Sequence, residues 1–155
     1  RNKKIERFKV NFKAPLVVGY TNKHGNTGKM VKDVRFLKNR NPKIIGSVIT
    51  SMGQLTNYAK QAILKGNYEK VGELMNINQG FLDLLGVNTY ELSRMIYTAR
   101  ECGALGSKIT GAGGGGSIIA LCPGKVNKVA NGIAKEDNVL KVRFTKKGVS
   151  SRVKK

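Results

Sequence analysis

A cluster of glycines in the last third of the chain is the feature best suited to chemistry. The cluster consists of Gly111, Ala112, Gly113, Gly114, Gly115 and Gly116, with Lys108 shortly before it and Ser117 directly after it. Glycine loses more conformational freedom on folding than any other residue, so a glycine cluster inside a domain needs a reason. The usual reason is that a ligand or another backbone approaches more closely than a Cβ would permit. We call residues 111–116 the glycine loop and treat it as a candidate phosphate-binding or packing loop.

The residues around the glycine loop argue against two common nucleotide-binding motifs. Gly111, Gly113 and Gly116 have the spacing of a dinucleotide fingerprint, but that motif must open a helix. Here residues 118–121 are apolar and Pro123 follows, which predicts a short buried strand. A Walker loop ends in lysine before serine or threonine, whereas Gly116 is followed directly by Ser117. Two interpretations stay open: a loop between strands that packs on another phosphate-binding element, or a tight hairpin without a ligand.

The wider sequence resembles a family of small-molecule kinases that includes galactokinase, homoserine kinase, mevalonate kinase and phosphomevalonate kinase. Residues 101–117 resemble the third conserved motif of that family. Two further segments are similar to mevalonate kinases in particular: residues 72–89, and the pair Asn26 and Thr27 with the apolar residues that follow. The resemblance extends from about residue 14 to about residue 144. It implies a ferredoxin-like C-terminal kinase domain.

The resemblance also implies what this chain lacks. Kinases of the family carry the main ATP loop, the catalytic aspartate, a neighbouring lysine and the Mg²⁺ ligands in an N-terminal half. No second glycine- and serine-rich segment precedes a helix in this sequence. We therefore expect the C-terminal half of an ATP- and Mg²⁺-dependent mevalonate kinase, inactive alone and without a metal site of its own. Its expected partners are mevalonate and an N-terminal half in the same polypeptide or in a separate chain, and a homodimer stays open. A phosphomevalonate or homoserine kinase is the alternative within the family.

The resemblance assigns roles to individual residues. It places the Thr27 hydroxyl near the transferred phosphate, where it would support catalysis by orienting reacting groups; without the resemblance, Asn26 or Thr27 is an ordinary helix cap. The glycine loop and Ser117 would support the ATP loop of the other half or line the phosphates. Lys108 is a candidate phosphate contact, with a solvated lysine as the simpler alternative. Family members often carry histidine where Gln79 stands, and Asn78 is expected to face a polar network behind the loop.

The chain is strongly basic, with a formal net charge of +20 over 155 residues. Residues 1–44 hold 13 lysines and arginines against two acidic residues, whereas residues 45–123 are nearly neutral and residues 124–155 are again basic. Such a charge distribution can steer anionic ATP and mevalonate, complement an acidic partner, or bind nucleic acid. The simplest interpretation is a solvated lysine-rich surface. Aromatic residues do not recur on alternate strand positions, which disfavours a nucleic-acid-binding module.

The remaining composition limits location and metal chemistry. No apolar run approaches the roughly 20 residues of a membrane span, and no secretory signal pattern is present. Cys102 and Cys122 lack metal-site spacing and are expected to be free thiols in a reducing compartment. His24 is the sole histidine and is expected in an exposed loop. These features predict a cytoplasmic protein that does not associate with membranes.

Periodicity and cap residues predict an α+β domain with helices packed on one face of a small antiparallel sheet. Strands are expected over residues 14–20, 108–110, 117–122 and 139–144, the last with Leu140, Val142 and Phe144 on a half-buried face. Helices are expected from Asn26 or Thr27, from Pro42, from Asn67, from a cap at Asn88, and around residues 126–133. The domain is expected over residues 14–146, between a basic lead-in (1–13) and a basic tail (147–155).

Overall fold

The computed structural model describes residues 13–23 and 25–144. The expected basic lead-in, apart from Lys13, the basic tail and His24 therefore lie outside the described residues. Five helices and four strands follow one another within the described part, in the order β1 (Pro15–Tyr20), α1 (Thr27–Arg40), α2 (Pro42–Leu64), α3 (Tyr68–Leu84), α4 (Tyr90–Glu101), β2 (Gly106–Thr110), β3 (Ser117–Leu121), α5 (Val126–Ile133) and β4 (Asn138–Arg143).

The four strands form one antiparallel sheet in the order β2-β3-β1-β4. The glycine loop joins the two neighbouring strands β2 and β3. Helix α4 precedes β2 and α5 connects β3 to β4, which produces the β-α-β-β-α-β pattern of a ferredoxin-like domain. Helices α1, α2 and α3 are inserted between β1 and α4. The α+β fold and its ferredoxin-like topology are thus confirmed.

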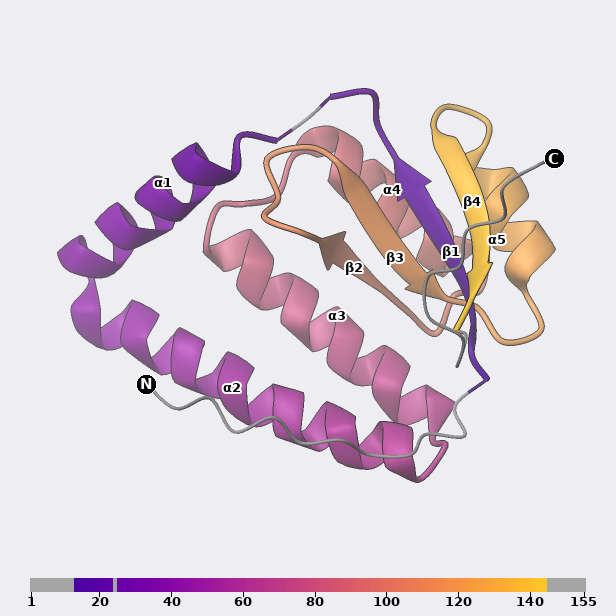
Figure 1. Cartoon of the computed structure of the whole chain (residues 1–155), viewed down its shortest axis with the longest axis horizontal. Coiled ribbons are helices and arrows are strands. Elements are labelled where there is room, and N and C mark those ends of the chain that lie inside the picture. Colours follow the sequence, from indigo (N-terminus) through magenta and orange to yellow (C-terminus); the bar gives the residue numbers. More distant parts are fainter. Residues whose placement is uncertain (1–12, 24, 145–155) are drawn as a thin grey trace, which may run out of the picture.

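Neighbouring residues of β1 face opposite sides of the sheet and so enter different cores. Val17 packs with Ile118 against Met95 of α4 and Val129 of α5, and these two helices cover one face as expected (Figure 1). Leu16 points the other way, into a second cluster built by residues of α2 and α3: Ala62, Val71 and Leu74. The helix pair α2 and α3 therefore packs beside the sheet and over part of its other face.

Helix α3 closes the outer edge of β2. Gly72 and Gly106 touch backbone to backbone, since a Cβ on Gly106 would lie 2.2 Å from the Gly72 carbonyl oxygen. Because the helix lies so close to the strand, the Asn76 side chain accepts a hydrogen bond from Ser107 N at 3.1 Å. Gln79 Oε1 likewise accepts a hydrogen bond from Ile109 N at 2.9 Å. Side-chain amides thus satisfy a strand edge that would otherwise present unpaired N–H groups.

Caps at the helix starts follow the sequence closely, with one correction. Asn26 caps α1 and Asn67 caps α3 through their side-chain oxygens, and Pro42 occupies the first turn of α2. The prediction of Asn88 as the cap of α4 is wrong by one residue. Thr89 is the cap and accepts from Leu92 N, because Asn88 is engaged with Asp83 and Ser93.

Parts of β4 and α1 are exposed to solvent. Strand β4 is antiparallel to β1 as predicted, and Val142 is half-buried as expected. Leu140 is 54% exposed and Phe144 is 61% exposed, so the predicted half-buried face is wrong at these two residues. Val139 on the other face of β4 packs against the α4–α5 core. Helix α1 forms as predicted, yet none of its residues is buried. Among the described residues, no helix combines the length and apolar character needed to cross a membrane.

Candidate functional site

The glycine loop is held between two other loops. Gly114 N donates to the Val87 carbonyl oxygen at 2.7 Å, which ties the loop to the turn between α3 and α4. Gly116 N donates to the Lys23 carbonyl oxygen at 2.9 Å, and Thr21 N donates back to the Gly116 carbonyl oxygen at 2.9 Å. The loop therefore has a defined conformation fixed by main-chain bonds on both sides.

Close backbone contacts explain why glycine is needed here. A Cβ on Gly113 would lie 2.2 Å from the Val87 carbonyl oxygen, and one on Gly25 would lie 2.2 Å from the Gly113 carbonyl oxygen. Five glycines of the loop have positive φ, a region that residues with a Cβ rarely adopt: Gly111, Gly113, Gly114, Gly115 and Gly116. Packing is therefore a sufficient reason for the glycines at the centre of the loop.

The two ends of the glycine loop are different from its centre. A Cβ on Gly111 or on Gly116 would meet no atom within 4 Å. Gly111 is exposed, whereas Gly113 and Gly115 are buried. The centre of the loop thus packs against this domain, whereas Gly111 is open to an approaching molecule and Gly116 is half-buried.

Thr27 begins α1 next to the glycine loop. Asn26 Oδ1 accepts from Lys29 N at 2.9 Å, so Asn26 and not Thr27 is the helix cap. Met30, one turn after Thr27, contacts Gly114, where an added Cβ would lie 2.7 Å from the methionine sulfur. The helix that begins at Thr27 therefore packs against the glycine loop through Met30, and Thr27 itself is exposed.

An ion pair joins the loop before Thr27 to helix α4. Lys23 Nζ bonds to the Glu91 carboxylate, while the Lys23 main chain accepts the bond from Gly116 N. The hydrogen bond from Lys23 is the largest cause that lowers the pKa of Glu91 from 4.5 to about 2, followed by the Glu91 backbone N–H. Lys23 is thus a link between the glycine loop and the start of α4.

Lys108 and Ser117 flank the loop on adjacent strands. Lys108 lies in the middle of β2, and its ammonium group bonds to the Ile109 carbonyl oxygen. Burial lowers the pKa of Lys108 from its usual range, because the charged form loses solvation. Ser117 opens β3 and is half-buried opposite Thr110. The Lys108 ammonium group has three N–H donors, and the bond to Ile109 uses one of them.

Sequence analysis missed several residues that hold the site together. Val87, Gly25 and the Lys23–Glu91 pair were not expected, and only the isolated glycine at Gly25 gave a local signal. Behind the loop, the polar contacts come from Gln79 and Asn76, whereas the sequence favoured Asn78. Long-range contacts of this kind leave no periodic pattern in a single sequence.

The arrangement offers main-chain amides, a hydroxyl and nearby lysines to an anionic ligand. The first N–H groups of α1 lack intrahelical acceptors, which makes the helix start suited to negative charge. Within residues 13–23 and 25–144, no group of three or more histidine, cysteine, aspartate or glutamate side chains could hold a metal ion. The amides, the hydroxyl and the lysines suit a negatively charged ligand.

Comparison with known protein families agrees with this geometry. The family described as GHMP kinases C terminal matches residues 59–138, which include the glycine loop. The chain belongs to this family. The matched segment of this GHMP kinase C-terminal domain includes strands β2 and β3 and the glycine loop between them. Thr27 lies outside the matched segment.

Relatives of this GHMP kinase C-terminal domain are named mevalonate kinases. The chain is 43% identical over 147 residues to the mevalonate kinase of Methanothermobacter thermautotrophicus, covering 95% of this chain and 48% of that protein. It is 48% identical over 124 residues to the mevalonate kinase of Thermococcus gammatolerans, covering 77% of this chain and 37% of that protein. The chain therefore spans about half the length, or less, of these relatives.

A solved structure extends the likeness to three dimensions. The crystal structure of L. major mevalonate kinase in complex with R-mevalonate superimposes with a TM-score of 0.80 and 27% sequence identity. The matched part covers 83% of this chain and 41% of that one. The GHMP kinase C-terminal domain thus has the fold found in part of a mevalonate kinase.

Proposed function

We propose that this chain supplies the C-terminal half of an ATP-dependent mevalonate kinase. The complete enzyme transfers the γ-phosphoryl group of ATP to a hydroxyl of mevalonate, with the N-terminal half in the same polypeptide or in a second chain. The proposal is supported by mevalonate kinase relatives at 43% and 48% identity that are about twice as long or longer. The chain alone is inactive because, apart from the glycine loop, its sequence has no glycine- and serine-rich segment before a helix that could serve as the main ATP loop.

The observation that carries the proposal is the contact between the glycine loop and the start of α1. Gly25 and Met30 touch Gly113 and Gly114, so the loop fixes the position of the helix that begins with Thr27. The family resemblance gave phosphate-related roles to the glycine loop and to Thr27 separately. The glycine loop and the start of α1 are in direct contact. Thr27 is exposed, and the helix cap is Asn26, so the Thr27 hydroxyl is not needed for capping. A loop that served only for packing would not explain this exposed hydroxyl on the helix that it contacts.

In this mechanism the chain's residues position the reactants. The Thr27 hydroxyl orients the reacting hydroxyl or the γ-phosphate, and the N–H groups at the start of α1 stabilise negative charge there. The buried glycines hold the loop against this domain, so that the phosphate-bearing face of the N-terminal half can approach Gly111. The residues that would hold Mg²⁺ belong to the N-terminal half, and the ion would supply neutralisation of the charge that develops on the phosphates.

The basic charge of the chain fits anionic substrates. Helix α1 carries five lysines and arginines against Asp33, and all of these residues are exposed. ATP and mevalonate are both anions, so a positive surface beside the site raises their encounter rate. This contribution falls as salt screens the surface charges.

Reconstitution tests the proposed function. The chain is assayed for ATP-dependent phosphorylation of mevalonate alone and after assembly with the N-terminal half of a relative such as the Methanothermobacter thermautotrophicus enzyme. We expect turnover only in the assembled sample. Turnover by the chain alone would show that it has its own catalytic machinery, and an assembled but inactive complex would overturn the kinase assignment.

The acceptor is tested in the same assay. Phosphomevalonate and homoserine replace mevalonate at equal concentration, and we expect the highest kcat/KM with mevalonate. A preference for either alternative would assign the chain to the corresponding kinase. Salt-dependent binding of a nucleic acid that persists at physiological ionic strength would instead support a basic binding module that uses the same fold.

A further inference from the structure

The ion pair between Lys23 and Glu91 lies beside the glycine loop. It joins two segments that are 68 residues apart in the sequence. Lys23 stands between β1 and α1, shortly before Thr27, and Glu91 stands in the first turn of α4. The pair therefore connects the segment that leads to Thr27 with a helix of the core.

Glu91 is a fixed anchor for this pair. Its carboxylate also accepts hydrogen bonds from the side chain of Thr89, the cap residue of α4, and from the Glu91 backbone N–H. The next residue, Leu92, is fully buried in the core, and Met95 is buried one turn further along the helix. The packing of α4 therefore sets the position of the Glu91 carboxylate.

The main chain of Lys23 contacts the glycine loop. Its carbonyl oxygen accepts a hydrogen bond from Gly116 N at 2.9 Å and another from the Thr21 hydroxyl at 3.1 Å. The Thr21 oxygen in turn accepts from Lys23 N at 3.2 Å. A Cβ on Gly115 would lie 3.1 Å from the same Lys23 carbonyl oxygen. Lys23 is thus held by its side chain on α4 and by its main chain on the glycine loop.

The chain around the start of α4 holds the glycine loop through a second contact. The carbonyl oxygen of Val87, one turn before Glu91, accepts a hydrogen bond from Gly114 N at 2.7 Å. This short stretch therefore holds the glycine loop through Val87, and it holds the segment before Thr27 through Glu91 and Lys23. A shared support of this kind fixes the two parts of the candidate site relative to each other.

We propose that Lys23 and Glu91 are positioning residues for phosphoryl transfer, which hold the Thr27 segment in place against the glycine loop. Neither side chain touches a substrate in this role. A small displacement of a group that orients the reactants lowers the rate of the chemical step, even when the displaced contact is remote. The effect on rate rests on the proposed function, whereas the effect of the pair on the order of the loop does not.

Two other roles explain the pair less well. The Lys23 side chain is 75% exposed and that of Glu91 is 32% exposed, and ion pairs with such exposure contribute little to global stability. An acidic residue in the first turn also suits the dipole of α4, but the dipole requires no lysine at position 23. A direct phosphate contact by Lys23 would give this residue a function that Glu91 does not share, and kinetics can separate the two cases.

Kinetics of the assembled kinase test the proposal. Lys23→Met and Glu91→Gln each remove the ion pair, and each should lower kcat about tenfold while KM for ATP changes by less than about twofold. The double variant should be no slower than either single variant, because all three lack the same interaction. Lys23→Arg keeps the pair and should retain most of kcat.

Amide hydrogen exchange of the 155-residue chain gives a readout that does not depend on activity. The Gly116 N–H should exchange about tenfold faster in Lys23→Met and in Glu91→Gln, because its acceptor on Lys23 is less firmly held. The Gly114 N–H should exchange at an unchanged rate, because its acceptor is Val87. This difference between two glycines of one loop excludes general unfolding as the cause.

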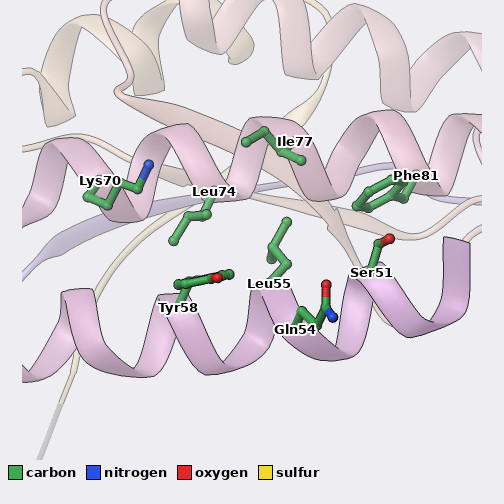
Figure 2. Close-up of a pocket in the computed structure, with 8 residues that line it drawn as sticks. All are labelled: Ser51, Gln54, Leu55, Tyr58, Lys70, Leu74, Ile77 and Phe81. Atoms are coloured by element: carbon green, nitrogen blue, oxygen red, sulfur yellow. The ribbon is translucent and has the colours of Figure 1, made fainter. Parts of the chain in front are cut away.

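Lys70 and Glu73 form a matched control pair on α3. Their charged groups lie 2.7 Å apart, and the two side chains are 46% and 55% exposed. Figure 2 shows Lys70 at the pocket between α2 and α3. Lys70 lies in the first turn of α3, whereas Val87 follows the other end of that helix. Lys70→Met should therefore leave both kcat and the exchange of the Gly116 N–H unchanged.

The possible outcomes separate this proposal from the proposed function. With an active assembled kinase, an unchanged kcat or an unchanged Gly116 exchange rate in Lys23→Met and Glu91→Gln would overturn the positioning role. An equal effect of Lys70→Met would also overturn it. A raised KM for ATP in Lys23→Met alone would show instead that Lys23 contacts the phosphates. Inactivity of the unmodified assembly would count against the proposed function, and hydrogen exchange would then still decide whether the pair orders the loop.

Discussion

The carbonyl oxygen of Val87 lies 2.7 Å from Gly114 N and would lie 2.2 Å from a Cβ placed on Gly113. The turn between α3 and α4 thus bonds to one glycine and excludes a side chain at its neighbour. A side chain added in the loop can therefore lower stability in two ways, by a steric clash or by an unfavourable backbone conformation. Variants at different glycines separate these two effects.

Gly113→Ala should lower the free energy of unfolding by about 3 kcal/mol, because it combines an unfavourable φ of +79° with a clash against Val87. Gly111→Ala is the matched control, with a φ of +84° and no atom within 4 Å of the added Cβ. It should cost about 1 to 2 kcal/mol, the conformational part alone. Urea unfolding measures both, and equal losses would show that the Val87 contact is not restrictive.

Thr27→Ala should lower kcat of the assembled kinase on the order of a hundredfold, because a positioning hydroxyl is lost from the transfer site. The melting temperature should change little, since Thr27 is exposed and the cap is Asn26. Thr27→Ser restores a hydroxyl and should recover most of kcat, and Thr56→Ala is a control for threonine loss at a helix surface. Equal activity of Thr27→Ala and the unmodified enzyme would remove Thr27 from the site.

Glu91 should stabilise the fold only above acidic pH. Its pKa is lowered from 4.5 to about 2, chiefly by the hydrogen bond from Lys23, so the folded state favours the carboxylate. The contribution is complete above the unfolded pKa near 4.5 and is lost as pH falls toward 2. The stability difference between the unmodified chain and Glu91→Gln should therefore shrink over this window. A difference that is constant from neutral pH to pH 2 would contradict the pairing with Lys23.

Gln79→Leu should destabilise the domain by about 2 kcal/mol, because it leaves Ile109 N–H buried without an acceptor. Gln79 also donates to Asp83 Oδ1 at 3.2 Å, so the substitution removes both bonds. The matched change at an exposed glutamine of α2, Gln61→Leu, should alter stability by less than about 0.5 kcal/mol. Chemical denaturation compares the two, and similar effects would show that α3 closes the β2 edge by packing alone.

The sequence alone determined the elements of this protein, because their signals are local. Asn26 and Asn67 each bond to an N–H three residues ahead, and Pro42 fits a first helical turn whatever the rest of the chain does. Alternating and 3.6-residue apolar patterns identified the α+β class. Residues 101–117, residues 72–89 and the segment around Thr27 resemble one kinase family, and this resemblance indicated the family and named the candidate phosphate site.

Only the tertiary structure decided how those elements meet. Gln79 reaches Ile109 across 30 residues and Lys23 reaches Glu91 across 68, and neither distance leaves a repeating pattern in the sequence. Leu140 and Phe144 of β4 are more exposed than predicted for the same reason, since apolar periodicity does not say whether another element covers a face. The sequence left open whether the glycine loop is packed or accessible. The answer depends on the position of Val87, which is set by contacts between distant parts of the chain.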